Sequence, residues 1–208
     1  GFEAPGGRTE RSVSITMRTP GNDAELATGF LFTESIIRDT TDIAFVKSCG
    51  PPAPDSGNHN VMRVELESGV PVDLDRLERH FYTTSSCGVC GKTSLDALRV
   101  LGAKEPAAAG LRFDRELLTA LPERLRAEQQ VFDATGGLHA AAAFNASGEL
   151  VVVHEDVGRH NAVDKVVGAL LSRDMIPASE LGLLVSGRAS FELMQKAVMA
   201  GMPLLAAI

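Results

Sequence analysis

Apolar and polar residues alternate along two stretches in the first third of the chain, and an apolar-rich segment lies between them. This two-residue period is typical of a half-buried β-strand. In the first stretch Val13, Ile15 and Met17 share one face. We therefore predict strands over SVSITM (12–17), IAFVKS (43–48) and VMRVELE (61–67).

Other segments repeat apolar residues every three or four positions, as one face of a helix does. After the turn TPGND, Asp23 can cap a helix that carries Leu26, Phe30 and Leu31. Pro122 would interrupt or restart a later helix. The further predicted helices cover 73–81, 93–101, 114–132, 160–171 and 191–200.

The last third of the chain predicts an α/β arrangement. HAAAAFNASGELVVVHED (139–156) is typical of a β-hairpin that turns near Ser147 and Gly148. LGLLVS (181–186), the helix after it and PLLAAI (203–208) form a strand–helix–strand unit, so part of the sheet should be parallel. The remaining segments are a predicted exposed loop, CGPPAPDSGNHN (49–60), and a predicted linker, AKEPAAAG (103–110).

Composition narrows the class of protein. The 208 residues suit one large domain or two small ones, and 44% of them are hydrophobic. A net charge of -7 argues against a nucleic-acid surface. No stretch approaches a membrane-spanning length, and the first residues lack a signal-peptide pattern. We therefore expect a soluble, cytoplasmic protein.

The segment SSCGVCGKTS holds Cys87 and Cys90 just ahead of a predicted helix. Free backbone N–H groups and the helix dipole stabilise a thiolate there, and Lys92 adds positive charge. A lowered thiol pKa serves disulfide exchange and persulfide formation equally, so this chemistry leaves both open. The isolated Cys49 is interpreted as structural.

A zinc site is the competing interpretation of the cysteine pair. Structural zinc takes about four protein ligands, and neither Cys49 nor any histidine stands at a recognisable spacing from the pair. A zinc deaminase would show Pro-Cys-x-x-Cys after an upstream His-x-Glu. Here Ser86 precedes Cys87, and no metal ligand is assigned.

Two strand-to-helix junctions predict an anion site. The first contains Gly158, Arg159 and His160, and the second contains Ser186, Gly187 and Arg188. Helix N-termini offer free N–H donors, glycine permits close approach, and arginine binds phosphate in a planar fork. Ligands of open α/β sheets bind beyond the carboxyl ends of strands, where both junctions would lie.

Structural roles remain open at these junctions. Arg159 can pair with Glu155 or Asp156, and Arg188 with Glu192, as plain ion pairs. Ser190 can act as a helix N-cap. His154 and His160 are either catalytic or ordinary strand-end and cap residues. TGGLH (135–139) adds a further glycine-rich turn, which a loop into the hairpin would explain.

Taken together, SSCGVCG, TGGLHAAA, EDVGRHNAVDK and SGRASFELMQKA closely resemble the formate dehydrogenase accessory sulfurtransferase (FdhD) family. The resemblance implies a sulfur carrier that receives sulfur from a cysteine desulfurase as a persulfide on Cys87, with Cys90 as its partner. The sulfur would pass to a molybdenum (or tungsten) bis-molybdopterin guanine dinucleotide cofactor for insertion into formate dehydrogenase. A guanine nucleotide such as GDP would serve as a surrogate for half of that cofactor.

The resemblance also implies the architecture. We expect a cytidine-deaminase-like three-layer α/β domain with a mixed sheet and a smaller N-terminal α+β region, in a homodimer. The expected regions are 1–84, a mobile Cys-x-x-Cys loop with its helix at 85–104, and the α/β core at 105–208. The family continues past PLLAAI with a Ser-Ala-Pro-Thr segment and a glycine-rich segment, so the C-terminal end is expected to be truncated.

Overall fold

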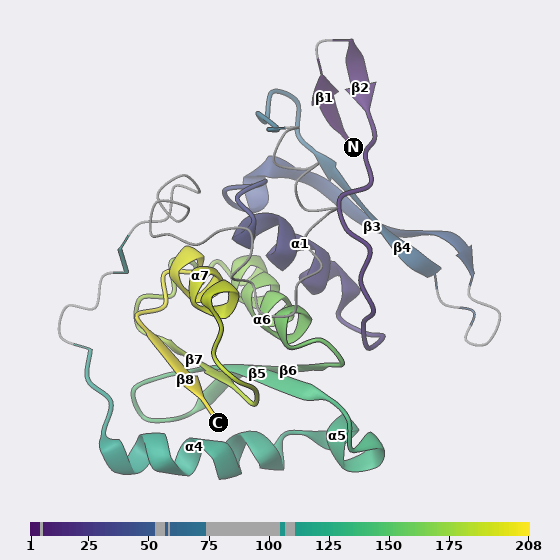
Figure 1. Ribbon diagram of the computed structural model, residues 1–208. Helices are drawn as coiled ribbons and strands as arrows, with labels where there is room; N and C mark the ends of the chain where they lie inside the picture. The colour runs from purple at the N-terminus through teal and green to yellow at the C-terminus, as the bar shows by residue number, and fades with distance from the viewer. Residues whose placement is uncertain (5, 53–56, 58, 74–104, 107–110) are drawn as a thin grey trace.

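The computed structural model describes residues 1–4, 6–52, 57, 59–73, 105–106 and 111–208 (Figure 1). The predicted helices 73–81 and 93–101, the cysteine pair and most of the predicted linker lie outside the described residues. The elements are β1 (Phe2–Ala4), β2 (Gly7–Thr9), α1 (Asp23–Thr33), the 3-10 helix η1 (Thr40–Asp42), β3 (Ile43–Pro52), β4 (His59–Leu66), α4 (Arg115–Ala127), α5 (Gln130–Thr135), β5 (His139–Phe144), β6 (Leu150–Asp156), α6 (Arg159–Ser172), β7 (Gly182–Val185), α7 (Phe191–Met199) and β8 (Leu204–Ala207).

A 4-stranded mixed sheet with the order β6-β5-β7-β8 forms the centre of the fold. Strand β5 pairs antiparallel with both β6 and β7, whereas β7 and β8 are parallel. The predicted hairpin is confirmed, and its turn includes Gly148 at a φ of 77°. The parallel pair predicted from the strand–helix–strand unit is confirmed as well.

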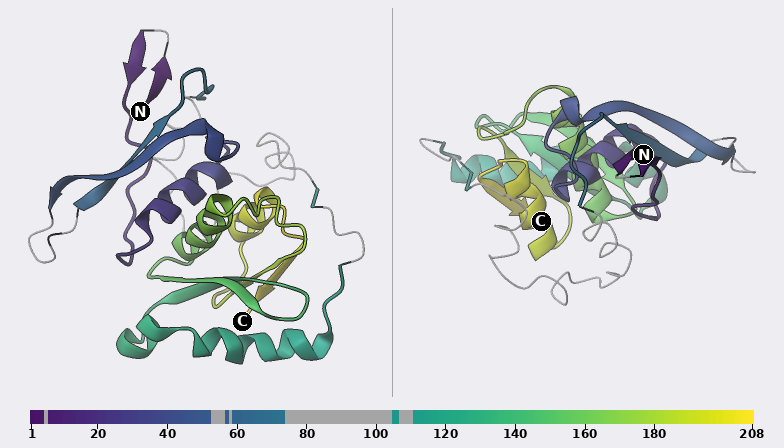
Figure 2. Two further views of the ribbon diagram at one scale, coloured as in Figure 1. Left: turned by 180° about the vertical axis from the view of Figure 1, so that it is seen from behind. Right: turned by 90° about the horizontal axis from the view of Figure 1, so that it is seen from above.

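Helices cover both faces of this sheet (Figures 1 and 2). Successive side chains of β5 point to opposite faces of the sheet. Ala140, Ala142 and Phe144 therefore pack toward α4, while Ala141 and Ala143 join the core beneath α6. The larger core also contains residues of α1 and β4, so the N-terminal region and the C-terminal α/β unit share one hydrophobic core. Beyond α1 lies the antiparallel ribbon of β3 and β4 (Figure 1).

Helices α1 and α6 approach to backbone contact through two glycines. A Cβ on Gly29 would lie 1.9 Å from the carbonyl oxygen of Asp164, and a Cβ on Gly168 would lie 2.0 Å from that of Glu25. Real side chains do not tolerate such distances, so only glycine permits this crossing. The close approach brings the polar end of α1 against α6 and α7.

We expect Gly168→Ala to lower the free energy of unfolding by roughly 1–3 kcal/mol, because the added methyl group forces the two helices apart. The better helix propensity of alanine, about 1 kcal/mol, offsets part of that loss. Gly137→Ala is the control, because a Cβ there would meet only the Thr135 carbonyl oxygen at 4.0 Å. Denaturant unfolding measures both variants, and an unchanged midpoint for Gly168→Ala would contradict the crossing described here.

A buried ion pair joins the same helices. Lys196 Nζ of α7 lies 2.8 Å from Asp164 Oδ1 of α6 and donates to Thr33 Oγ1 of α1 at 3.0 Å. The Thr33 hydroxyl donates to Asp164 Oδ1 at 2.9 Å. Glu34 Oε1 lies 3.6 Å from the same ammonium group. Asp164 and Lys196 are only 2% and 1% exposed, so removal of either charge would leave the other without its main partner.

The prediction of a strand over 12–17 is wrong. This segment is extended but belongs to no sheet of the described residues, and the Ile15 and Met17 side chains are 88% and 79% exposed. Alternation is a local signal, whereas a strand requires a hydrogen-bonded neighbour. Val13 alone of the predicted face packs against the core.

Three predicted boundaries also change. Asn22, at a φ of 56°, is the N-cap of α1, while Asp23 is the first helical residue and its carboxylate binds Arg18 Nη2 at 2.6 Å. Strand β3 runs on to Pro52, into the predicted loop 49–60. Helix α4 passes through Pro122 and ends at Ala127, and α5 follows as a separate helix.

None of the described helices is both long enough and apolar enough to cross a membrane.

Candidate functional site

The two strand-to-helix junctions lie at the same edge of the sheet. Strands β6 and β7 both run antiparallel to β5, so they run in the same direction and end together. The pairing of His139 with Asp156 and of Ala141 with Val185 fixes their relative register. Helix α6 begins just beyond one strand end and α7 beyond the other. The shared edge predicted from the sequence is therefore present.

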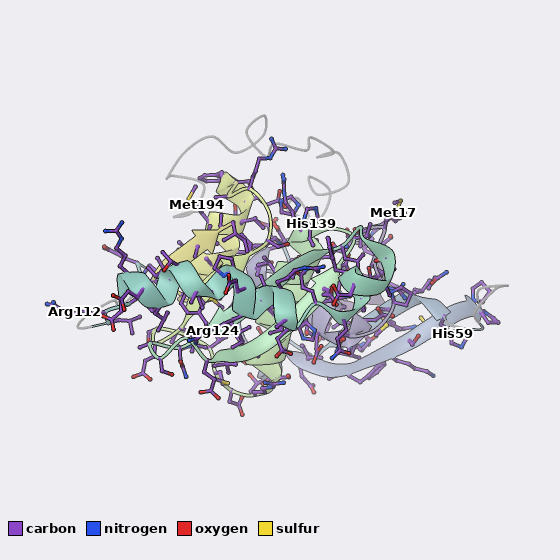
Figure 3. All side chains as sticks on the ribbon, turned by 90° about the horizontal axis from the view of Figure 1, so that it is seen from below. Met17, His59, Arg112, Arg124, His139 and Met194 are labelled. Atoms are coloured by element: carbon purple, nitrogen blue, oxygen red, sulfur yellow. The ribbon has the colours of Figure 1, made fainter. Side chains whose placement is uncertain are left out.

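Gly187 lies where the two junctions meet. A Cβ at this residue would lie 3.3 Å from His139 Nδ1 and 3.8 Å from Arg159 Cδ. The glycine thus leaves room for side chains from the start of β5 and from the first turn of α6. Figure 3 shows His139 on the same side of the molecule as Met17 and Met194.

His139 is a further candidate for the site, which the predicted anion site did not include. His139 is the last residue of the glycine-rich turn TGGLH, and a plain loop into the hairpin explains that pattern equally well. The feature that places His139 near the site is its position as the first residue of β5, the strand between β6 and β7. At that position an antiparallel strand begins at the edge where its two neighbours end.

The two helices begin in different ways. Gly158 is the N-cap of α6 and provides no side-chain hydrogen bond. Ser190 is the N-cap of α7, and its hydroxyl accepts a hydrogen bond from the Leu193 amide at 3.4 Å. The structural role weighed for Ser190 is therefore confirmed. Ser186 Oγ accepts from the Ala140 amide at 2.8 Å, which ties the end of β7 to β5.

The acidic partners weighed for the two arginines have other contacts. The Glu155 carboxylate accepts hydrogen bonds from the amides of Val131 and Phe132, at the start of α5. Asp156 binds Lys165 Nζ at 2.8 Å. Glu192 contacts His160, and the exposed Arg188 forms no ion pair within the described part of the chain. These contacts leave the Arg188 guanidinium available to an anion.

The two candidate histidines are paired with glutamates. His160 Nε2 lies 3.3 Å from Glu192 Oε2, and His154 Nε2 lies 3.2 Å from Glu25 Oε2. Burial lowers the pKa of both histidines, and the adjacent glutamates oppose this effect. Both imidazoles are therefore mainly neutral at pH 7. His160 presents a neutral imidazole beside Arg159 in the first turn of α6.

One of two cavities lies away from the junctions, and the other borders the turn before α6 through Thr19 and Lys165. One of about 290 Å³ opens between α1 and β3 and is mainly apolar. Another of about 250 Å³ has Thr19, His154 and Lys165 in its wall.

Within the described ranges no group of His, Cys, Asp or Glu side chains is placed to hold a metal ion. Cys49, in β3, is a half-buried free thiol, and Cys87 and Cys90 lie outside the described residues.

Comparison with curated proteins finds close relatives along most of the chain. The sulfur carrier protein FdhD of Mycolicibacterium paratuberculosis is 53% identical over 198 residues, which cover 95% of this chain and 73% of the relative. The protein of the same name from Streptomyces coelicolor is 55% identical over 201 residues, or 95% of this chain and 71% of the relative. The sulfur carrier protein FdhD of Saccharolobus solfataricus is 43% identical over 195 residues, which cover 94% of this chain and 69% of the relative.

The fold has a counterpart among solved structures. A putative formate dehydrogenase accessory protein from Desulfotalea psychrophila superposes with a TM-score of 0.64 at 21% sequence identity, covering 99% of this chain and 80% of that one. The model of the FdhD/NarQ family matches residues 8–208, which include both junctions and the cysteine pair. The chain therefore belongs to the FdhD/NarQ family.

Proposed function

We propose that this protein is a sulfur carrier that supports formate dehydrogenase, as the resemblance implies. Family membership across residues 8–208, with both cysteines inside the match, carries the proposal. The relatives at about half identity are named sulfur carrier proteins. Expression in a cell that lacks its own FdhD should restore formate dehydrogenase activity, and no restoration would count against the carrier role.

The proposed sulfur donor is a cysteine desulfurase. The Cys87 thiolate attacks the terminal sulfur of the desulfurase persulfide, so a sulfur–sulfur bond forms on Cys87 and the desulfurase leaves as a thiolate. Electrons balance in this step, because persulfide exchange needs no external oxidant. Attack by the Cys90 thiolate on the inner sulfur of Cys87 would then release the outer sulfur as hydrosulfide. Oxidation of the Cys87 and Cys90 sulfurs to a disulfide supplies the two electrons that reduce the released sulfur, and a thiol reductant then regenerates both cysteines.

The proposed sulfur acceptor is the molybdenum bis-molybdopterin guanine dinucleotide cofactor. The protein carries a net charge of -7, so the cofactor phosphates must be held by local donors rather than by a global field. Arg159 and Arg188, at one edge of the sheet, provide such donors. Gly158, His160, Ser186 and Gly187 complete the proposed binding surface, and GDP should occupy part of it.

Several finer features belong to the same proposal. The mixed sheet with helices on both faces suits a cytidine-deaminase-like core with a smaller N-terminal region, and a homodimer is the expected assembly. The proposed regions remain 1–84, 85–104 and 105–208, whose boundaries fall beside or within the undescribed segment. Cysteine desulfurase and formate dehydrogenase are the proposed partners, and the cytoplasm is the proposed compartment.

We expect Arg159→Ala and Arg188→Ala each to weaken GDP binding about tenfold or more, because each removes a charge-assisted hydrogen bond worth roughly 1.5–3 kcal/mol. Lysine at either position should recover only part of the loss, since it lacks the planar fork. Isothermal titration calorimetry measures the affinities, and thermal unfolding monitors the fold.

The control is Arg173→Ala, because Arg173 follows α6 at its opposite end. This variant should bind GDP like the wild-type protein. Wild-type affinity in both junction variants would refute their assignment as ligands. If their melting temperatures fell at the same time, a structural role would explain the two arginines instead.

A further inference from the structure

The turn that leads into α6 is held by a carboxylate outside the helix. Asp156, the last residue of β6, is fully buried. Its Oδ1 accepts hydrogen bonds from the Gly158 amide and from Asn161 Nδ2, both at 2.9 Å. Its Oδ2 accepts from the Thr19 amide at 3.1 Å and forms an ion pair with Lys165 Nζ at 2.8 Å. Both oxygens of one buried group therefore fix the turn.

Thr19 contacts this turn from a distant part of the sequence. Besides its amide contact with Asp156, its Oγ1 accepts a hydrogen bond from the Val157 amide at 3.0 Å. Its carbonyl oxygen accepts from Lys165 Nζ at 2.9 Å. The amide, hydroxyl and carbonyl oxygen of one residue are all directed to the start of α6.

Asn161, in the first turn of α6, contacts the same N-terminal segment. Its Nδ2 donates to the Met17 carbonyl oxygen at 2.8 Å as well as to Asp156. The segment 17–19 is therefore bound to α6 at two points. The N-cap residue Gly158 has no side chain to bond the first-turn amides, and the external contacts bind the Val157 and Gly158 amides that precede them.

We propose that Asp156 and Thr19 are positioning residues for the anion site. They hold the turn 156–158 so that Gly158, Arg159 and the first amides of α6 face the proposed ligand. The segment 17–19 thus supports the proposed site through the turn that it holds. This inference rests on the proposed function for its ligand, but the positioning itself can be measured without one.

Thr19→Val tests the hydroxyl with little change in side-chain volume. The Val157 amide should exchange its hydrogen about tenfold faster than in the wild-type protein, because its acceptor is gone. GDP affinity should fall about fivefold, the loss expected for one hydrogen bond. Thr19→Ser keeps the acceptor and should restore both values to within about twofold. Thr119→Val is the control, because that hydroxyl bonds only within α4, to the Glu116 carbonyl oxygen.

Asp156→Asn should weaken GDP binding more than Thr19→Val does, because it disturbs both oxygens of the carboxylate. Its control is Asp164→Asn, which also breaks a buried Asp–Lys pair but one that lies deeper in the core. We expect that variant to lower stability and to keep GDP affinity within about twofold at a temperature where it is folded. An affinity that followed melting temperature alike in both variants would overturn the proposal.

The two measurements separate this inference from the proposed function. If the wild-type protein fails to bind GDP, the cofactor site is wrong, and hydrogen exchange at Val157 and Gly158 still decides whether the turn is held as described. Unchanged exchange at Val157 in Thr19→Val would overturn the positioning role. So would wild-type GDP affinity in both Thr19→Val and Asp156→Asn.

Discussion

Cys87→Ser should abolish the support of formate dehydrogenase while the protein remains folded. A serine hydroxyl cannot hold a persulfide sulfur, so the loss should be complete rather than graded. The assay is formate dehydrogenase activity in a cell whose own FdhD is deleted and replaced by the variant, with circular dichroism to confirm the fold. Full activity with Cys87→Ser would contradict the assignment of Cys87.

The other two cysteines provide graded controls in the same assay. Cys90→Ser should reduce activity without removing it in every condition, because the proposed release of sulfur can use an external thiol instead. Cys49→Ser should keep wild-type activity, since Cys49 lies in β3 and we propose no chemical role for it. A complete loss with Cys49→Ser would indicate a role that the account lacks.

Asp164→Asn should lower the free energy of unfolding by about 3–5 kcal/mol, because it leaves the Lys196 ammonium buried without its main partner. A loss of this size is a large part of the stability of an ordinary domain. Urea unfolding at pH 7 measures it. The matched control is Asp42→Asn at a buried carboxylate near the surface, which pairs with the exposed Arg38. That variant should lose less free energy of unfolding, because the exposed Arg38 guanidinium can be hydrated once its partner is gone.

The intact pair should nevertheless contribute little net stability. Burial raises the pKa of Asp164 to about 6, and its contacts with Lys196 and Thr33 act in the opposite direction. Because this folded-state pKa exceeds the ordinary value of 3.8, the Asp164 contribution to stability declines as the pH rises from about 4 to 6. The double variant Asp164→Leu with Lys196→Met should therefore recover at least part of the loss. A double variant less stable than Asp164→Asn would contradict this reasoning.

Much of the C-terminal half could be predicted from the sequence. The strand 181–186, the helix 191–200 and the hairpin 139–156 are long, regular patterns bounded by turn residues, and each is present within a few residues of its predicted limits. The shared edge of Gly158 and Gly187 followed from the strand directions alone. These features depend on local periodicity and on chain connectivity, which a sequence shows directly.

The errors arise where distant parts of the chain decide the outcome. Residues 12–17 alternate like a strand, but Asn161 binds the last of them, Met17, and Asp156 binds Thr19. No neighbouring strand pairs with the segment in the described structure. Aspartate is a common N-cap residue, but the Asp23 carboxylate binds Arg18 instead. The place of His139 beside Gly187 likewise required the sheet order. None of these contacts has a signal in local sequence.

The most direct test of the central claim is intact-protein mass spectrometry after incubation with a cysteine desulfurase and cysteine. We expect a gain of one sulfur atom, about 32 Da, that a thiol reductant removes and that Cys87→Ser does not show. A mass loss of about 2 Da, reversed by the reductant, would instead identify a thiol–disulfide redox protein. Zinc retained under native conditions, with no added sulfur, would identify a metal site and contradict the carrier function.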